Sequence, residues 1–166
     1  MSYLPEDFTF DPNSEDALPN MREMYREIVQ YTRLVRNQYT PTLEASGANG
    51  TVTYTAQTGW YIRHANVVDY WFNVTWSAWA GGAGNMRLIL PSKIIDVDTN
   101  YFVGEMTSSN VAYANAADTW CKPRGAKDKN YADILSGRHN AAAGFVQAQA
   151  TGDLFGHIRY WSQEIA

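Results

Sequence analysis

The chain has 166 residues and a formal net charge of −4, with 45% hydrophobic and 14% aromatic residues. This length indicates one domain with or without an appendage, and the hydrophobic content excludes wholesale disorder. The negative charge argues against nucleic acid as the main partner, because phosphate binding needs a basic face. No apolar run approaches the roughly 18 residues of a membrane span, and the first residues lack the pattern of a signal peptide. We therefore expect no membrane partner and no Sec-type export.

Residues 1–16 are predicted to form an extended N-terminal anchoring arm. They are acidic, contain a proline and show neither helix nor strand periodicity, so a disordered terminus is the alternative. Three aromatic side chains, Tyr3, Phe8 and Phe10, stand among the acids. We expect these three to anchor the arm on a partner surface or on a second subunit.

Residues 17–37 are predicted to form the single helix, a helical neck. Its apolar residues recur at spacings of three and four, which is the pattern of a heptad seam. An isolated helix of this length is marginal in water, so the seam either packs on its own β-domain or meets copies of itself. We favour self-association. The seam residues are Leu18, Met21, Tyr25, Ile28 and Val35.

Residues 38–166 are predicted to form a β-head that begins with a Pro/Gly/Ser hinge over 38–50. The clearest strand signal is the alternating run Val68 to Ala78, in which every second residue is apolar and Trp71 is the one bulky residue on the polar face. A strand of about eleven residues is long. It indicates a wide sheet with one buried face, as in a sandwich or jelly roll.

The remaining strands are separated by turn signals, and no helical period intervenes, which favours an antiparallel all-β fold of about eight strands over a parallel sheet. The last two are expected to form a closing hairpin, and residues 121–130 a polar excursion. The predicted strands are 51–56, 59–64, 67–79, 86–90, 101–106, 111–113, 144–149 and 154–161.

The sequence offers little catalytic or metal-binding chemistry. None of the three histidines stands at a zinc spacing, and Cys121 has no Cys-x-x-Cys partner, so we expect neither a metal nor a cofactor. A small hydrolase stays open as an alternative if Cys121 lies beside a histidine or if two carboxylates share a pocket. The candidate carboxylates are Asp69, Asp96, Asp98, Glu105 and Asp118.

Two groups of residues are candidates for surface contacts. Tryptophans can stack on a glycan, although most tryptophans on sheets belong to a core or an interface; Trp71 and Trp79 are our candidates for glycan or partner contact, among Trp60, Trp71, Trp79, Trp120 and Trp161. The second group is a small basic loop, which is either solvated or in contact with an acidic surface or anionic sugar. It contains Lys122, Arg124, Lys127 and Lys129.

The order of these features resembles small tailed-bacteriophage virion proteins with a jelly-roll head like that of tumour necrosis factor. The resemblance covers residues 39–91 and 152–166. A glycine that follows the arginine in those proteins is replaced here by His64-Ala65-Asn66, where asparagine tolerates a left-handed turn. The matching segments are Tyr39-Thr40-Pro41-Thr42-Leu43, Gln57 to Arg63, Leu88-Ile89-Leu90-Pro91, Gly152-Asp153-Leu154 and Ile158-Arg159-Tyr160.

The resemblance implies a non-enzymatic homotrimer that is made in the host cytoplasm and lies on the virion surface. Such proteins serve as capsid decoration (cement) proteins, head fibres, or tail-fibre and receptor-binding tips. The implied partners are the major capsid protein or another virion protein and, for a tail tip, a host-surface glycan. We rank decoration first, because the heptad seam is short for a tail shaft. A carbohydrate-binding β-sandwich outside a virion is the remaining alternative.

Overall fold

The computed structural model describes residues 36–95 and 102–163. The chain divides into two units, residues 1–34 and 35–166, and all described residues belong to the second. The predicted anchoring residues Tyr3, Phe8 and Phe10 lie outside the described residues. So do the predicted seam residues, which are Leu18, Met21, Tyr25, Ile28 and Val35.

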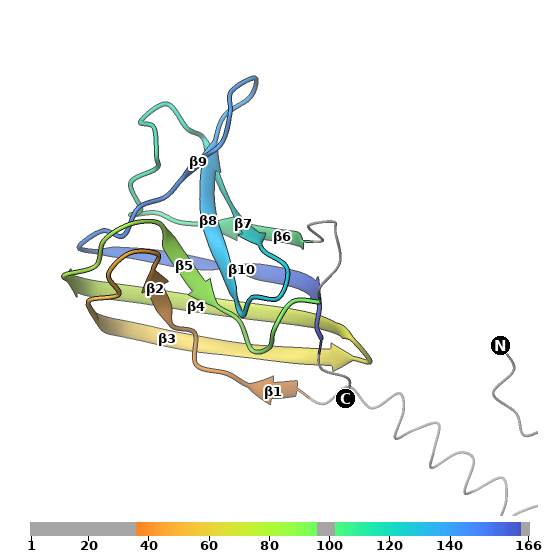
Figure 1. Cartoon of the computed structure of the whole chain (residues 1–166). Helices are drawn as coiled ribbons and strands as arrows, with labels where there is room; N and C mark the ends of the chain where they lie inside the picture. The colour runs from red at the N-terminus through yellow and green to blue at the C-terminus, as the bar shows by residue number, and fades with distance from the viewer. Residues whose placement is uncertain (1–35, 96–101, 164–166) are drawn as a thin grey trace, which may run out of the picture. The chain divides into compact units, whose positions relative to one another are not determined.

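The described residues form ten β-strands and no helix (Figure 1). Every strand pair is antiparallel, so the all-β antiparallel prediction is confirmed. The strands are β1 (Arg36–Gln38), β2 (Leu43–Ala45), β3 (Thr51–His64), β4 (Val67–Ala80), β5 (Met86–Ile89), β6 (Phe102–Thr107), β7 (Trp120–Gly125), β8 (Tyr131–Gly137), β9 (Gly144–Phe145) and β10 (Gly152–Trp161).

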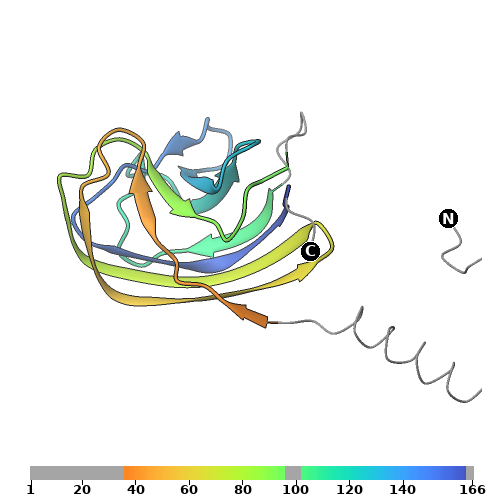
Figure 2. The same cartoon turned by 60° about the horizontal axis from the view of Figure 1, so that its bottom comes forward.

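The strands hydrogen-bond into a single sheet that curls on itself (Figure 2). Its order is β1-β3-β4-β10-β6-β7-β8-β5-β2, with β9 paired to β8. The two edge strands are neighbours in sequence, so residues 39–42 bridge the open side of the curl. Tyr39 N donates to Gly59 O (3.0 Å) at one edge, and Ile89 N donates to Thr42 O (2.9 Å) at the other. This single curled sheet does not confirm the jelly-roll arrangement.

Strand β4 supplies much of the core, as its alternation predicts. Its residues Val68, Tyr70, Phe72, Val74 and Trp76 are buried on the inner face. They face buried side chains from the rest of the curled sheet, including Met86, Leu88, Ile134, Leu154 and Ile158. The outer face of β4 is therefore free to carry a functional surface.

The alternation of β4 breaks at Ser77, and this corrects the prediction for Trp79. Thr53 pairs with Ala78 and Tyr54 pairs with Trp76, so the register skips Ser77. The skipped residue turns Trp79 inward, where it is 7% exposed and donates from Nε1 to Asn49 O (2.6 Å). Trp79 is thus a core residue and was wrongly predicted to be a glycan or partner contact.

Several predicted boundaries are wrong because strand pairing overrides local sequence. Arg36 and Asn37, the end of the predicted helix, lie in β1 and pair with β3. Residues 51–64 form one strand, residues 111–113 form none, and the predicted polar excursion contains all of β7 except its first residue. The expected closing hairpin is absent, since β9 pairs with β8 whereas β10 lies between β4 and β6. The turn at 64–66 forms, but Ala65, not Asn66, has the positive φ, 51°.

Two glycines, Gly104 on β6 and Gly156 on β10, lie where these two strands pair. A Cβ on Gly156 would collide with the backbone of Glu105 and Met106, and a Cβ on Gly104 would lie 2.5 Å from the carbonyl oxygen of His157. Beyond this pair, β6 meets β7 in register only at Met106 and Cys121. The sheet therefore turns at β6, next to the surface described below.

Candidate binding surface on the outer face of the long strands

Four outward-facing residues stand in one row across neighbouring strands. Trp60 on β3 pairs with Trp71 on β4, Trp71 pairs with His157 on β10, and His157 pairs with Glu105 on β6. Directly opposed residues in a sheet lie about 5 Å apart, so their rings stack. The ring centroids are 3.9 Å apart for Trp60 and Trp71 and 4.4 Å apart for Trp71 and His157. Arg36 continues the row, with Cζ 4.2 Å from the Trp60 centroid.

This stacking determines how the two tryptophans can contact a ligand. Trp71 lies between Trp60 and His157, and Trp60 lies between Arg36 and Trp71. Each indole therefore has a neighbour against both of its flat faces and offers its edge to solvent. Stacking of a sugar requires a free flat face, so Trp71 does not provide the platform predicted for it, although it borders the ligand-sized depression described below.

Asp69 lies on β4, two residues before Trp71, and fixes the orientation of His157 on β10. It is 4% exposed and accepts hydrogen bonds from Arg159 Nε (2.7 Å) and Nη2 (2.8 Å), while its Oδ1 lies 2.9 Å from His157 Nε2. Burial raises the pKa of the Asp69 carboxyl, but the hydrogen bonds from Arg159 and His157 outweigh it and the net pKa is lowered. The ionised Asp69 accepts a hydrogen bond from His157 Nε2, which leaves Nδ1 as the ring nitrogen of His157 that Asp69 does not engage.

Beside this row lies a depression of about 450 Å³ on the outer face of β4, β10 and β6. Phe155 is the exposed aromatic residue in it, with 41% of its surface accessible. Glu105, Thr107 and His157 contribute polar groups, and Met106 and Gly156 contribute apolar lining. The full lining is Trp71, Glu105, Met106, Thr107, Phe155, Gly156 and His157.

Among the described residues, the depression does not bring two carboxylates together, and Cys121 has no histidine among the contacts that the structure shows for it. Glu105 is the single carboxylate in the lining of the depression. The buried Cys121 contacts Met106 O (3.7 Å) and Tyr113, and burial raises the pKa of its thiol. Within residues 36–95 and 102–163, no group of three or more His, Cys, Asp or Glu residues is placed to hold a metal ion. No helix of that part of the chain has the length and apolarity to cross a bilayer.

Most residues of this surface were not predicted from the sequence. Phe155 and His157 alternate with buried residues along β10, since Leu154, Ile158 and Tyr160 face the core. This period-two pattern in the sequence could have identified Phe155 and His157 as outward-facing residues. Their meeting with Glu105 and Trp71 was not visible, because it depends on β10 lying between β4 and β6.

The predicted basic loop is divided between two structural elements. Lys122 and Arg124 lie on β7 with exposed side chains, whereas Lys127 and Lys129 lie in the connection from β7 to β8. Lys122 and Arg124 are therefore held on a sheet face, and Lys127 and Lys129 are not.

Comparison with known proteins gives one structural relationship. No protein-family model matches the chain, and no curated protein matches it. The crystal structure of the Dettilon tailspike protein (gp208) is similar in fold, with a TM-score of 0.54 and 16% sequence identity. The match covers 75% of this chain and 23% of the tailspike chain, so this chain spans about a quarter of the length of that protein. At this identity the likeness shows a shared fold.

Proposed function

We propose that this chain is a non-enzymatic, tail-associated virion protein of a bacteriophage that binds a saccharide in the depression beside Phe155. Two observations support a virion protein: the sequence segments that resemble small phage virion proteins, and a fold shared with part of a tailspike protein. The observation that carries the binding role is the depression of about 450 Å³, whose lining combines Phe155 with Glu105, Thr107 and His157.

A saccharide fits the chemistry of this depression. A pyranose ring has an apolar face of C–H groups that packs on an aromatic ring, and a rim of hydroxyls that need polar partners. Phe155 offers the exposed aromatic ring. Glu105 accepts hydrogen bonds, Thr107 both donates and accepts, and His157 adds the ring nitrogen that Asp69 does not engage. The volume lies in the range of about 300 to 1,000 Å³ that is usual for ligand sites.

The charge of the lining favours a neutral saccharide over an acidic one. Glu105 is exposed and carries the single carboxylate of the lining. The guanidinium of Arg159, which is close by on β10, is engaged with Asp69 through two hydrogen bonds. An acidic sugar would therefore meet a like charge at Glu105 without a free cation to offset it.

We place the protein at the tail in preference to the capsid, because the structural neighbour is a tailspike. Capsid decoration, to which the short heptad seam first pointed, becomes the second choice. The proposed assembly is a homotrimer joined through the seam at Leu18, Met21, Tyr25, Ile28 and Val35. The arm with Tyr3, Phe8 and Phe10 would dock it on another virion protein and leave the β-module at the virion surface.

An array of bacterial surface polysaccharides, probed with labelled full-length protein, tests the binding role. We expect a neutral saccharide to bind, and Phe155→Ala and Glu105→Gln to weaken its binding by about tenfold each, since each removes one principal contact. Trp161→Ala is the matched control, because Trp161 is an equally exposed aromatic (40%) on the same strand outside the depression. Equal losses for Phe155→Ala and Trp161→Ala, or binding to no saccharide, would contradict the proposal.

A further inference from the structure

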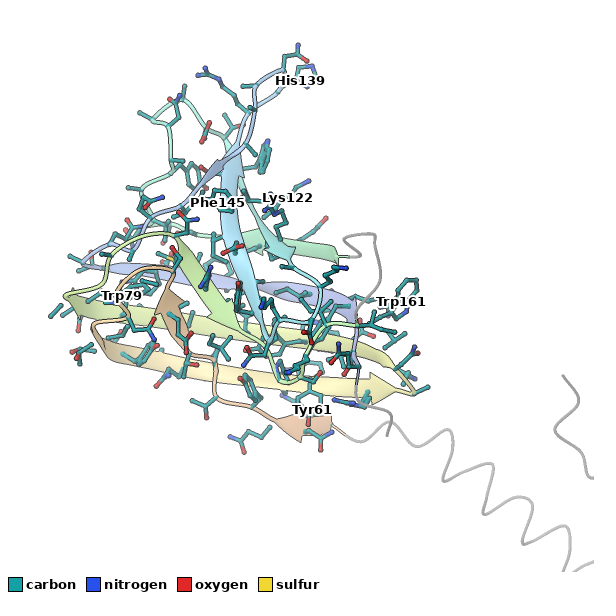
Figure 3. All side chains as sticks on the ribbon, viewed as in Figure 1. Tyr61, Trp79, Lys122, His139, Phe145 and Trp161 are labelled. Atoms are coloured by element: carbon teal, nitrogen blue, oxygen red, sulfur yellow. The ribbon has the colours of Figure 1, made fainter. Side chains whose placement is uncertain are left out.

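A second surface of the sheet carries cations that lie over aromatic rings. Lys122 on β7 lies 5.4 Å from the Trp120 centroid. Arg124 on the same strand lies 4.9 Å from the ring of Phe145 on β9. Lys122 and Phe145, both labelled in Figure 3, flank Leu135 of β8 from its two sides. This cationic strip, consisting of Trp120, Lys122, Arg124 and Phe145, shares no residue with the depression beside Phe155.

The cations of the strip are available for a ligand. Both Lys122 and Arg124 are exposed, and neither has an acidic partner within the described residues. The acid nearest to them in register is Asp133, opposite Arg124. Asp133 is 7% exposed and bonds to Arg87 on the next strand (3.1 Å). The strip thus has unneutralised positive charge on a chain whose net charge is −4.

Trp120 lies against the sheet at one end of the strip. Its register partner on β8 is Gly137, and a Cβ on Gly137 would collide with the indole ring. The ring therefore covers the position that a side chain would otherwise occupy, as aromatic residues do across from strand glycines. This contact fixes an aromatic surface next to the ammonium of Lys122.

We propose that the cationic strip is a binding site for an acidic polysaccharide. The carboxylates or other anionic groups of the polymer would pair with Lys122 and Arg124, which stand two residues apart on one face of a strand and hence about 7 Å apart. Its sugar rings would pack against the edges of Trp120 and Phe145, because Lys122 and Arg124 lie over the faces of these two rings. Charge-assisted hydrogen bonds to arginine and lysine are the strong ones for such groups.

Two other anionic partners fit the strip less well. A nucleic acid needs a basic groove that follows many phosphates, whereas the strip offers two unpaired cations on an open strand of an acidic protein. An acidic protein surface would satisfy the cations but does not require aromatic rings beneath them. A polymer of acidic sugars can contact both the unpaired cations and the aromatic rings beside them.

Binding of the full-length protein to alginate, a polymer of uronic acids, tests this site. We expect binding that weakens with added salt, with neutral dextran not bound. The double variant Lys122→Gln/Arg124→Gln should weaken it by about tenfold or more through the loss of two charge-assisted contacts. Lys127→Gln/Lys129→Gln removes the same charge from the adjoining connection and should change binding less than about twofold, because both lie off the sheet face.

Three outcomes would overturn this site. These are no binding of alginate, equal losses for the two double variants, or polyglutamate competing as well as alginate, which would indicate an acidic protein as the ligand. Gly137→Ala, which displaces Trp120, should also weaken alginate binding, and retention of full affinity would count against the aromatic contact. Phe155→Ala should leave alginate binding unchanged, so failure here is distinguishable from failure of the depression beside Phe155.

Discussion

At the scale of single residues, Asp69 has the clearest structural role on the outer face. Its carboxylate accepts two hydrogen bonds from Arg159 and contacts His157, although the residue is almost fully buried. We expect Asp69→Asn to lower the free energy of unfolding by about 1–3 kcal/mol, because the charged hydrogen bonds are lost while the site stays buried. Urea denaturation of the full-length protein measures this change.

Asp128→Asn is the control for this substitution. Asp128 makes a long ion pair with Lys93 (3.9 Å), and both side chains are more than half exposed. Such a pair contributes little in water, so this variant should change the free energy of unfolding by less than about 0.5 kcal/mol. Equal effects of the two substitutions would mean that the Asp69 cluster does not stabilise the sheet.

The same carboxylate makes stability depend on pH. The folded protein lowers the pKa of Asp69, and also that of Asp153, where hydrogen bonds from Ser109, Ser108 and Asn110 outweigh the effect of burial. A carboxyl with a lowered folded pKa contributes stability above its unfolded pKa of about 3.9, and this contribution is lost as the pH falls through the folded pKa. We expect urea midpoints to change little from pH 7 to about pH 5 through these two groups, to fall as the pH drops below about 3.9, and to fall less in Asp69→Asn. An unchanged pH dependence in that variant would contradict this assignment.

Residue-level prediction from sequence succeeded where strand alternation alone decides burial. From Tyr70 to Trp76, buried residues alternate with more exposed ones as the apolar pattern of the sequence predicts, whereas the outward-facing Asp69 is also buried. Trp79 was misplaced because one skipped residue, Ser77, reverses the facing of everything after it. Such a bulge depends on the partner strand β3 and leaves no signal within β4.

At the scale of elements, the pairing of β6 with β10 depends on the glycines at their closest approach. A Cβ on Gly156 would collide with the β6 backbone at Glu105 and Met106. We expect Gly156→Ala to destabilise the protein by about 1–3 kcal/mol, because the strands must move apart, and to weaken saccharide binding because these strands line the depression. Thermal or urea unfolding measures the first effect and calorimetric titration the second.

Thr107→Ala tests whether this effect is specific to the close strand contact. Thr107 is an exposed residue on β6 and also lines the depression, so its truncation should weaken binding while changing stability within about 0.5 kcal/mol. A tolerated alanine at position 156 would show that the two strands do not need their close approach.

Two elements show why the sequence predicted the fold class better than the strand order. Residues 121–130 were predicted to be a polar excursion, yet β7 forms at Trp120–Gly125 because it pairs with β8 along its whole length. Pro123 is tolerated there because β7 pairs with β6 only at Cys121, which leaves its other edge open. Strand β10 was expected to form a hairpin with its predecessor, but its buried face completes the core between β4 and β6. Both outcomes depend on contacts distant in sequence.

At the scale of the whole molecule, the proposed trimer makes a direct prediction of mass. Light scattering of the full-length protein should give three times the chain mass of 18.7 kDa. Ile28→Asp places a charge in the predicted heptad seam and should shift the mass toward that of a monomer. Glu27→Gln, next to the seam position in sequence, should leave the trimer intact. A monomeric wild-type protein would contradict the proposal.

The measurement that tests the account most directly is a crystal structure of the full-length protein with the neutral saccharide that binds it best. We predict the sugar ring against Phe155, with hydroxyls bonded to Glu105 and His157 in the depression between β4, β10 and β6. A sugar bound elsewhere on the sheet, or a depression left empty at saturating saccharide, would contradict it.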